Sequence, residues 1–274
     1  MQLKPRENYL FFRLLPDKSL SHTTANKGVK KQKDRITVAL CCNSDGSKKL
    51  KPFVIGKAAR PRCFRNFNAL SYVTYASNKN AWMTSQLFDQ WLHEFDRSMR
   101  LKKRKVLLLL DNATCHKPID DVTNIELHYL PPTTTSHLQP MDAGIIQSFK
   151  SKYRRQHLAS VIDQIDDDKD TAIQLDDAIR YLRRAWDQVT SETMANCWKH
   201  TGLFIGPVLP AESPESDLED AINGYREVCQ PDADVITPYE YVNVDQTLAT
   251  EGELTDADII SSVSSREEDE NDEE

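Results

Sequence analysis

The 274-residue sequence predicts a layered α/β domain followed by an acidic tail, and three observations lead to this fold class. Short apolar segments alternate with longer segments whose apolar residues recur every three or four positions, as in the strands and helices of a layered domain. Residues 106–110, VLLLL, are an uninterrupted apolar run that is too short for a typical helix and typical of a strand covered on both faces. After Pro210 the apolar periodicity ceases and acidic residues dominate.

The first predicted elements are strands. Residues 36–43, ITVALCCN, are β-branched and apolar, and the pair Asp45-Gly46 supplies a turn before residues 53–56, FVIG. We therefore expect a hairpin. Residues 72–76, YVTYA, are a further strand candidate.

A helix is expected over residues 84–100, where large apolar residues recur at three- and four-residue steps. Thr84 is placed to cap its amino terminus, and Met83 is placed to pack against Phe88. The strand at 106–110 follows, and a second strand is expected over 125–130, ended by two prolines.

Two more helical regions follow. One begins near Asp142, after Pro140, with the apolar residues Ile145, Ile146, Phe149 and Tyr153 on its inner face. Four basic residues are expected on its outer face: Lys150, Lys152, Arg154 and Arg155. The other covers residues 176–200, with a break near Thr190.

The charge is divided between two parts of the chain. Residues 211–274 carry 21 acidic and 2 basic residues, a net charge of −19, whereas residues 1–210 carry 21 acidic and 33 basic residues, a net charge of +12. A basic body favours polyanions such as nucleic acid, and a merely well-solvated surface is the alternative. The acidic part is expected to be a disordered tail.

Composition also limits the compartment. The six cysteines form no CxxC pair, and reduced thiols in an intracellular protein are the expectation for a chain of this size. No apolar run approaches the length of a membrane span, and the amino terminus lacks the pattern of a signal peptide. We expect a nuclear or cytoplasmic protein without membrane partners.

Two aspartates are the candidates for chemistry. Asp111 directly follows the apolar strand, at the kind of strand end where α/β sheets place ligands, and Asp142 lies in the first turn of a basic helix. Asp111 alone is equally well explained as a turn or capping residue, and Asp142 alone is better explained as a residue that complements the helix dipole without a function. Together they could supply part of a carboxylate site for divalent cations such as Mg²⁺.

Other chemistries fit less well. No GxxxxGK[ST] phosphate-binding loop occurs, and Ala113 stands where a phosphoaspartate hydrolase would place a second acid. Cys115, His116 and His137 have no partner pair at the spacing of a zinc site.

Four segments carry a family resemblance: RITVALCCNSDGSKKLKPFVIGKAARPRCF, LLLLDNATCH, LPPTTTSHLQPMDAGIIQSFK and AWDQVTSETMANCWKHTGLF. In this order they resemble the catalytic domain of pogo/Tigger-type DDE transposases, which jerky-like and centromere protein B-like proteins share. The resemblance implies an RNase H-like fold, a mixed central sheet with flanking helices, and two-metal cleavage of DNA with Mg²⁺ or Mn²⁺. It places the second and third catalytic and metal-binding acids at Asp111 and Asp142, flanked by Asn112, His116 and Gln139.

The sequence departs from this family at the first acid. The motif that carries it corresponds to residues 6–12, RENYLFF, where Glu7 matches and Arg6 replaces the metal-binding aspartate. Pro5 is expected to interrupt any strand there. The helix-turn-helix modules of the family are also missing, so either the copy has decayed or the amino terminus of a longer protein is truncated. The predicted organisation is a degenerate remnant at 1–8, the transposase-like domain at 9–205 and the acidic disordered tail at 206–274.

These observations predict a transposase-derived, nuclear DNA-binding protein that is catalytically incomplete and needs no cofactor. One alternative is an active Mg²⁺-dependent endonuclease in which Glu7 serves as the replacement catalytic carboxylate. The other is a protein-interaction module that acts through the acidic tail. Oligomeric state is not predicted. The expected DNA-binding residues are Lys30, Lys31, Lys33, Lys150, Lys152, Arg154 and Arg155.

Overall fold

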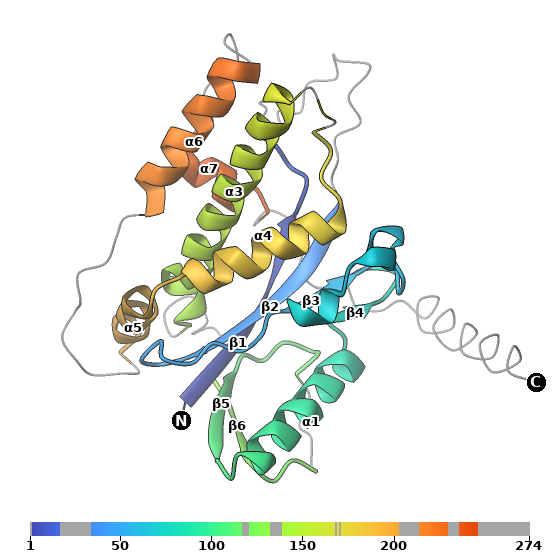
Figure 1. The fold of residues 1–274 in the computed structure, drawn as a ribbon. Helices are drawn as coiled ribbons and strands as arrows, with labels where there is room; N and C mark the ends of the chain where they lie inside the picture. The colour runs from blue at the N-terminus through green and yellow to red at the C-terminus, as the bar shows by residue number, and fades with distance from the viewer. Residues whose placement is uncertain are drawn as a thin grey trace, which may run out of the picture.

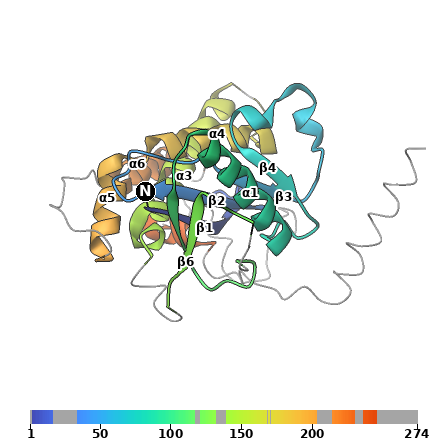
Figure 2. The same cartoon turned by 90° about the horizontal axis from the view of Figure 1, so that it is seen from below.

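A computed structural model of the chain describes residues 2–16, 34–116, 121–131, 139–167, 169, 171–202, 214–229 and 236–245. Its centre is a six-stranded sheet in the order β4-β3-β2-β1-β5-β6. The strands are β1 (Gln2–Phe11), β2 (Arg35–Asn43), β3 (Phe53–Gly56), β4 (Thr74–Ser77), β5 (Val106–Leu110) and β6 (Ile125–Tyr129). Figure 2 shows β1 and β2 in the middle of the molecule, with β6 to one side and β3 and β4 to the other.

The sheet is mixed, and its strand directions define one functional edge. β2 is antiparallel to both β1 and β3, whereas β4 is parallel to β3, and β5 is parallel to both β1 and β6. Five strands therefore run in one direction, and only β2 opposes them. The carboxyl ends of β1, β3, β4, β5 and β6 consequently lie at the same edge of the sheet.

The first strand corrects two predictions. β1 is continuous over Gln2–Phe11, so no boundary lies after residue 8, and Pro5 does not interrupt the strand. β1 pairs with β2 along most of its length but with β5 only through Gln2 and Leu3. Proline has no backbone N–H, so a strand tolerates it where that position has no neighbouring strand to bond with. Pro5 lies beyond Gln2 and Leu3, the two residues paired with β5.

One face of the sheet is covered by α1 (Ser85–Leu101), which lies in the lower part of Figure 1. The predicted cap is confirmed, because the Thr84 side chain accepts a hydrogen bond from the backbone N–H of Leu87. The apolar stripe of α1 packs against β5, where Leu108 and Leu110 belong to the same buried cluster as Phe88.

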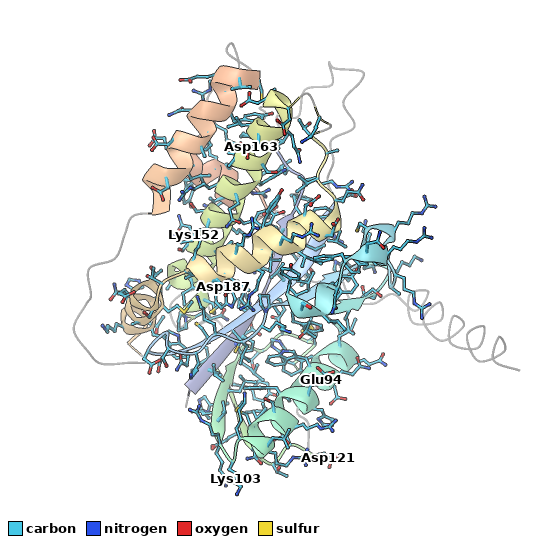
Figure 3. All side chains as sticks on the ribbon, viewed as in Figure 1. Glu94, Lys103, Asp121, Lys152, Asp163 and Asp187 are labelled. Atoms are coloured by element: carbon cyan, nitrogen blue, oxygen red, sulfur yellow. The ribbon has the colours of Figure 1, made fainter. Side chains whose placement is uncertain are left out.

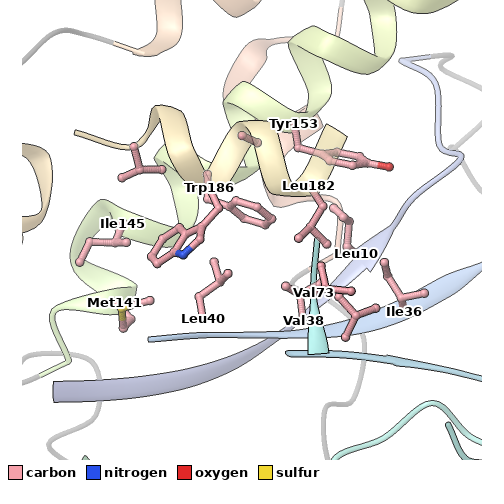
Figure 4. Packing of buried hydrophobic residues seen from close by; sticks show 14 of the residues in the cluster. Leu10, Ile36, Val38, Leu40, Val73, Met141, Ile145, Tyr153, Leu182 and Trp186 are labelled. Atoms are coloured by element: carbon pink, nitrogen blue, oxygen red, sulfur yellow. The ribbon is translucent and has the colours of Figure 1, made fainter. Parts of the chain in front are cut away.

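The other face carries α3 (Ile146–Asp166), α4 (Leu175–Gln188) and α5 (Ser191–His200). The expected break in the helix over 176–200 is thus confirmed, between α4 and α5. The largest core cluster lies here, and Figure 4 shows Trp186 and Leu182 of α4 packed over Leu40 and Val38 of β2. Leu109 of β5 belongs to this cluster, so β5 is covered on both faces, as predicted.

Two helices in the carboxyl-terminal region correct part of the predicted disordered tail at 206–274. α6 (Pro214–Cys229) and α7 (Pro238–Asn243) are helices, and α6 lies alongside α3 in Figure 1. Leu218, Ile222 and Tyr225 form a third buried cluster with Leu158 and other residues of α3. These contacts bury a second apolar stripe of α3 that the sheet does not cover. Residues 203–213, 230–235 and 246–274 lie outside the described residues, so disorder there stays a prediction.

Within the part of the chain that the structure describes, no helix is both long enough and apolar enough to cross a lipid bilayer.

Candidate functional site

The candidate site lies at the edge where β5 ends. Asp111 is the first residue after β5 and is buried, with 7% of its surface exposed. Asp142 lies in a wide helical turn, Met141–Ile145, that leads into α3 and contains Gly144 at a φ of 138°. The pairing of Leu3 with Leu108 brings Arg6 of β1 level with Asp111.

Arg6 lies between the two aspartates. Its Nη1 is 2.5 Å from Asp111 Oδ2, and its Nε is 3.3 Å from Asp142 Oδ1. Burial opposes the charge of the guanidinium, but Asp142 and Asp111 outweigh it and raise the pKa of Arg6 above its ordinary value. Asp111 and Asp142 therefore both lie beside one permanent positive charge.

Glu7 points away from this pair. Successive side chains of a strand project to opposite faces, so Glu7 and Arg6 cannot share one face of β1. The Oε1 atom of Glu7 lies 3.1 Å from His116 Nε2. The structure therefore brings Glu7 to His116 rather than to Asp142.

His116 links the two faces. Its Nδ1 lies 2.7 Å from Asp111 Oδ1, and its ring packs on Phe88 of α1 with the ring centroids 4.5 Å apart. Burial disfavours the charged ring, but the carboxylate of Glu7 and the hydrogen bond to Asp111 raise the pKa of His116 above its ordinary value. A protonated His116 donates one N–H to Asp111 and the other to Glu7.

The remaining predicted neighbours also lie near the strand end. Gln139 is fully buried and donates from Nε2 to Asp111 Oδ2 at 3.3 Å, while its own Oε1 has no hydrogen-bond partner among the described residues. Asn112 is exposed and donates to the carbonyl of Leu130, which ties the end of β5 to β6. Asp111 therefore accepts hydrogen bonds from Arg6, His116 and Gln139 side chains.

These residues do not fit a divalent metal ion. Mg²⁺ and Mn²⁺ require several oxygen ligands, usually carboxylates, around one point. Over the described ranges, no group of three His, Cys, Asp or Glu side chains is arranged to hold a metal ion. At the one point that faces both aspartates, a guanidinium lies in the place of a cation. His137 lies outside the described residues.

Two predicted DNA-binding residues do not face outward as expected. Lys150 is 4% exposed and Arg154 is fully buried, so neither faces outward on α3. The carboxylate of Asp245, whose side chain is also fully buried, lies 3.3 Å from Lys150 Nζ and 3.2 Å from Arg154 Nη2. Arg154 also donates to the backbone carbonyl of Phe11. The covering of α3 by α6 and α7 explains the difference.

The other predicted DNA-binding residues divide into two groups. Lys152 is partly exposed, and Figure 3 labels it on α3, whereas Arg155 is exposed and pairs with Asp217 of α6 at 2.7 Å. Lys30, Lys31 and Lys33 lie outside the described residues.

Asp245 was not predicted from the sequence, although its neighbourhood left signals there. Leu158, Val161, Ile162 and Ile165 give α3 an apolar stripe distinct from that of Phe149 and Tyr153, which indicates a second covering element. Leu218, Ile222 and Tyr225 recur at helical spacing within the acidic region. No sequence pattern singles out Asp245 itself among the many acids around it.

Comparison with known proteins places these residues in context. Residues 33–198 match the family described as DDE superfamily endonuclease. The chain is 33% identical over 219 residues to Tigger transposable element-derived protein 4 of Mus musculus, covering 80% of this chain and 42% of that protein. It is 32% identical over 239 residues to CENP-B homolog protein 2 of Schizosaccharomyces pombe, covering 80% of this chain and 46% of the relative.

A solved structure and a human relative are more distant. The human protein Major centromere autoantigen B is 28% identical over 204 residues, covering 73% of this chain and 33% of that protein. The Mos1 transposase in a paired-end complex with the left transposon end is 15% identical, with 73% of this chain and 55% of that chain covered, at a TM-score of 0.32. The chain spans less than half the length of the three curated relatives.

Proposed function

Because this chain belongs to the DDE superfamily endonuclease family, we propose that it is a transposase-derived domain that binds DNA in the nucleus without cutting it. One observation carries the proposal: the guanidinium of Arg6 lies between Asp111 and Asp142. The mixed sheet with helices on both faces agrees with the RNase H-like fold that this family implies.

The argument against cleavage is electrostatic. Two-metal cleavage of DNA needs cations held by carboxylates at the reacting phosphate. Arg6 pairs with both carboxylates that would hold them, and its charge persists at any working pH. A metal ion bound to both aspartates would lie about 4 Å from the guanidinium of Arg6. At the dielectric of a partly buried site, two such positive charges repel each other by several kcal/mol. Arginine in place of the first acid should therefore reduce cleavage activity more than a neutral residue at the same position would.

Glu7 is a poor replacement for the missing acid. It projects from the opposite face of β1 and is held by His116, which also holds Asp111. Turning Glu7 toward Asp142 would leave a buried, protonated imidazole without one of its two carboxylate partners, which costs several kcal/mol. This argues against the alternative of an active enzyme built on Glu7.

DNA binding is supported by charge and by the relatives. Residues 1–210 carry a net charge of +12, and contacts to phosphates need no metal ion. The relatives include a transposable element-derived protein, a centromere autoantigen and a protein named ARS-binding protein 1. Their names support the DNA ligand and the nuclear location. The activity of the whole protein is part of the proposal, because the chain spans less than half of these relatives.

The test combines binding and nicking. The chain is incubated with supercoiled DNA over a titration of Mg²⁺ or Mn²⁺, beside Arg6→Asp, Arg6→Gln and Asp111→Ala. Arg6→Gln is the matched control, since it removes the charge without adding a carboxylate. We expect the unaltered chain to shift DNA at low salt without nicking it, and Arg6→Asp alone to gain metal-dependent nicking.

Two results would overturn the proposal. Metal-dependent nicking by the unaltered chain that disappears in Asp111→Ala would show an active enzyme. If none of these proteins binds DNA even at low salt, the nucleic-acid function fails, and an interaction module acting through the acidic region takes its place.

A further inference from the structure

The connection between β3 and β4 carries a concentrated positive charge. Residues 57–65, KAARPRCFR, contain four basic residues and no acidic one. All four basic side chains are exposed: Lys57, Arg60, Arg62 and Arg65. Figure 3 shows side chains with nitrogen atoms at their ends extending outward from this cyan segment. We call these four residues the basic segment.

Aromatic contacts support the backbone of the basic segment. The ring of Phe64 meets Tyr75 of β4 edge-on at 4.9 Å, and Phe67 stacks on Tyr72 at 5.1 Å. The Tyr75 hydroxyl donates to the backbone carbonyl of Ala58 at 2.8 Å. Aromatic pairs and this hydrogen bond restrict the backbone that carries the basic side chains. Less conformational entropy is therefore lost when a ligand binds.

A second contact joins Phe67, two residues after the basic segment, to the helical layer. Arg180 of α4 lies over the Phe67 ring, with its guanidinium carbon 4.5 Å from the ring centroid. Arg180 is itself paired with Asp176 and Asp177 at 3.2 Å. The segment is thus fixed to β4 on one side and to α4 on the other.

The charges of the basic segment are not compensated within the described chain. No carboxylate of the described residues is within ion-pair distance of these four side chains, whereas Arg155, Arg180 and Arg183 each pair with an aspartate. The segment also borders an open hollow of about 640 Å³, whose lining residues are Ala59, Arg60, Pro61, Arg62, Phe64 and Arg65. The arrangement suits a ligand with several negative charges.

The basic segment and the aspartates lie at the same edge of the sheet. The strand registers place four residues in one row across the sheet. This row runs from Asp111 after β5 through Arg6 of β1 and Leu40 of β2 to Pro52 before β3. Lys57 lies five residues further along, across three strand spacings from Asp111. Strand geometry then separates the two by about 20 Å. One strand of duplex DNA spans this distance in about six nucleotides.

We propose that the basic segment is a docking surface for the phosphates of duplex DNA, placed to hold a duplex across the edge that carries Asp111. This inference rests on the proposed function and adds the surface that performs it. Exposed arginines fixed at the backbone contact phosphates without reading sequence. Binding at the basic segment should therefore be independent of DNA sequence and strongly dependent on salt.

The test measures the salt dependence of binding to a labelled duplex by fluorescence anisotropy. The variant Arg60→Gln/Arg62→Gln/Arg65→Gln is compared with Lys102→Gln/Lys103→Gln/Lys105→Gln. The control loses the same charge from exposed residues that precede β5, at the opposite edge of the sheet; Figure 3 labels Lys103 there.

The basic-segment variant should lose about 3 from the slope of log affinity against log salt, because each phosphate contact contributes about 0.9. Between 50 and 200 mM salt, the affinity of the unaltered chain should consequently fall about 40-fold more than that of the variant. The control should keep a slope within about one of the unaltered chain. Single substitutions should each remove about one, which general unfolding would not reproduce.

Equal slopes for the basic-segment variant and the control would overturn the inference while leaving the proposed function in place, since the unaltered chain would still bind DNA. Failure of the unaltered chain to bind DNA would overturn both.

Discussion

Replacing Asp245 by alanine should destabilise the chain by about 3–5 kcal/mol, because two buried cations lose their shared partner. The carboxylate of Asp245 is fully buried and pairs with Lys150 and Arg154, and it also accepts the backbone N–H of Phe11 at 3.1 Å. Arg154 cannot shed its charge, although the pKa of Lys150 is already lowered, mainly by burial. The predicted loss is a large fraction of the 5–15 kcal/mol that stabilises a typical domain.

The assay is equilibrium unfolding of the full chain in urea, with Asp217→Ala as the matched control. Asp217 also pairs an arginine of α3 with α6, but its side chain is 56% exposed. Its replacement should cost at most about 1 kcal/mol. If both variants lower the free energy of unfolding by the same amount, the buried ion pairs of Asp245 do not stabilise the packing of the carboxyl-terminal helices against α3, and the prediction is refuted.

The remaining predictions concern a turn and a buried histidine. Gly46 has a φ of +70°, and an added Cβ would lie 2.5 Å from Ser191 Cα, whereas Gly202 has a φ of +72° and open space around it. Gly202→Ala should therefore cost about 1 kcal/mol and Gly46→Ala about 3 kcal/mol in urea unfolding; equal losses would contradict the contact. Burial and the charge of Arg154 lower the pKa of His157 to about 3. Neutral His157 therefore leaves the free energy of unfolding undiminished above pH 6.5, and this free energy falls by up to about 1.4 kcal/mol per pH unit as the pH drops toward 3. The variant His157→Phe should have a smaller slope of unfolding free energy against pH between pH 6 and 4. An unchanged slope would show that His157 is not the responsible group.

Much of the fold could be predicted because local pattern and tertiary packing agree. The run Val106–Leu110 is apolar on both faces and is a strand with a core cluster on each side. The helix after Thr84 begins where its capping residue predicts. The short apolar run is typical of a strand covered on both faces and the three- and four-residue spacing is typical of a helix, and the structure adopts both.

The predictions failed where tertiary context overrides a local rule. Pro5 is tolerated in β1 because the ladder to β5 ends before it. Lys150 and Arg154 were expected on the outer face of α3 because charge was taken as a sign of exposure, whereas both share one buried aspartate about 90 residues away. Such long-range pairs leave no trace in a single sequence.

The proximity of Asp111 and Asp142 could be expected from the sequence, but the direction of Glu7 was not predicted. Motif spacing identified Asp111 and Asp142, and the register of β1 then brings Arg6 between them. The opposite direction of Glu7 follows from strand alternation once β1 is known to be a strand. The direction of Glu7 was not predicted from the sequence because Pro5 was expected to break β1.

The most direct test of the central claim, that Arg6 takes the place of a bound cation, is a Mn²⁺ titration followed by electron paramagnetic resonance, without DNA. At equimolar metal, the unaltered chain and Asp111→Ala should both leave the signal of free Mn²⁺ unchanged. Arg6→Asp should bind Mn²⁺ and reduce this signal. The double variant Arg6→Asp/Asp111→Ala should no longer bind the ion. Saturable binding of Mn²⁺ by the unaltered chain that disappears in Asp111→Ala would contradict the claim.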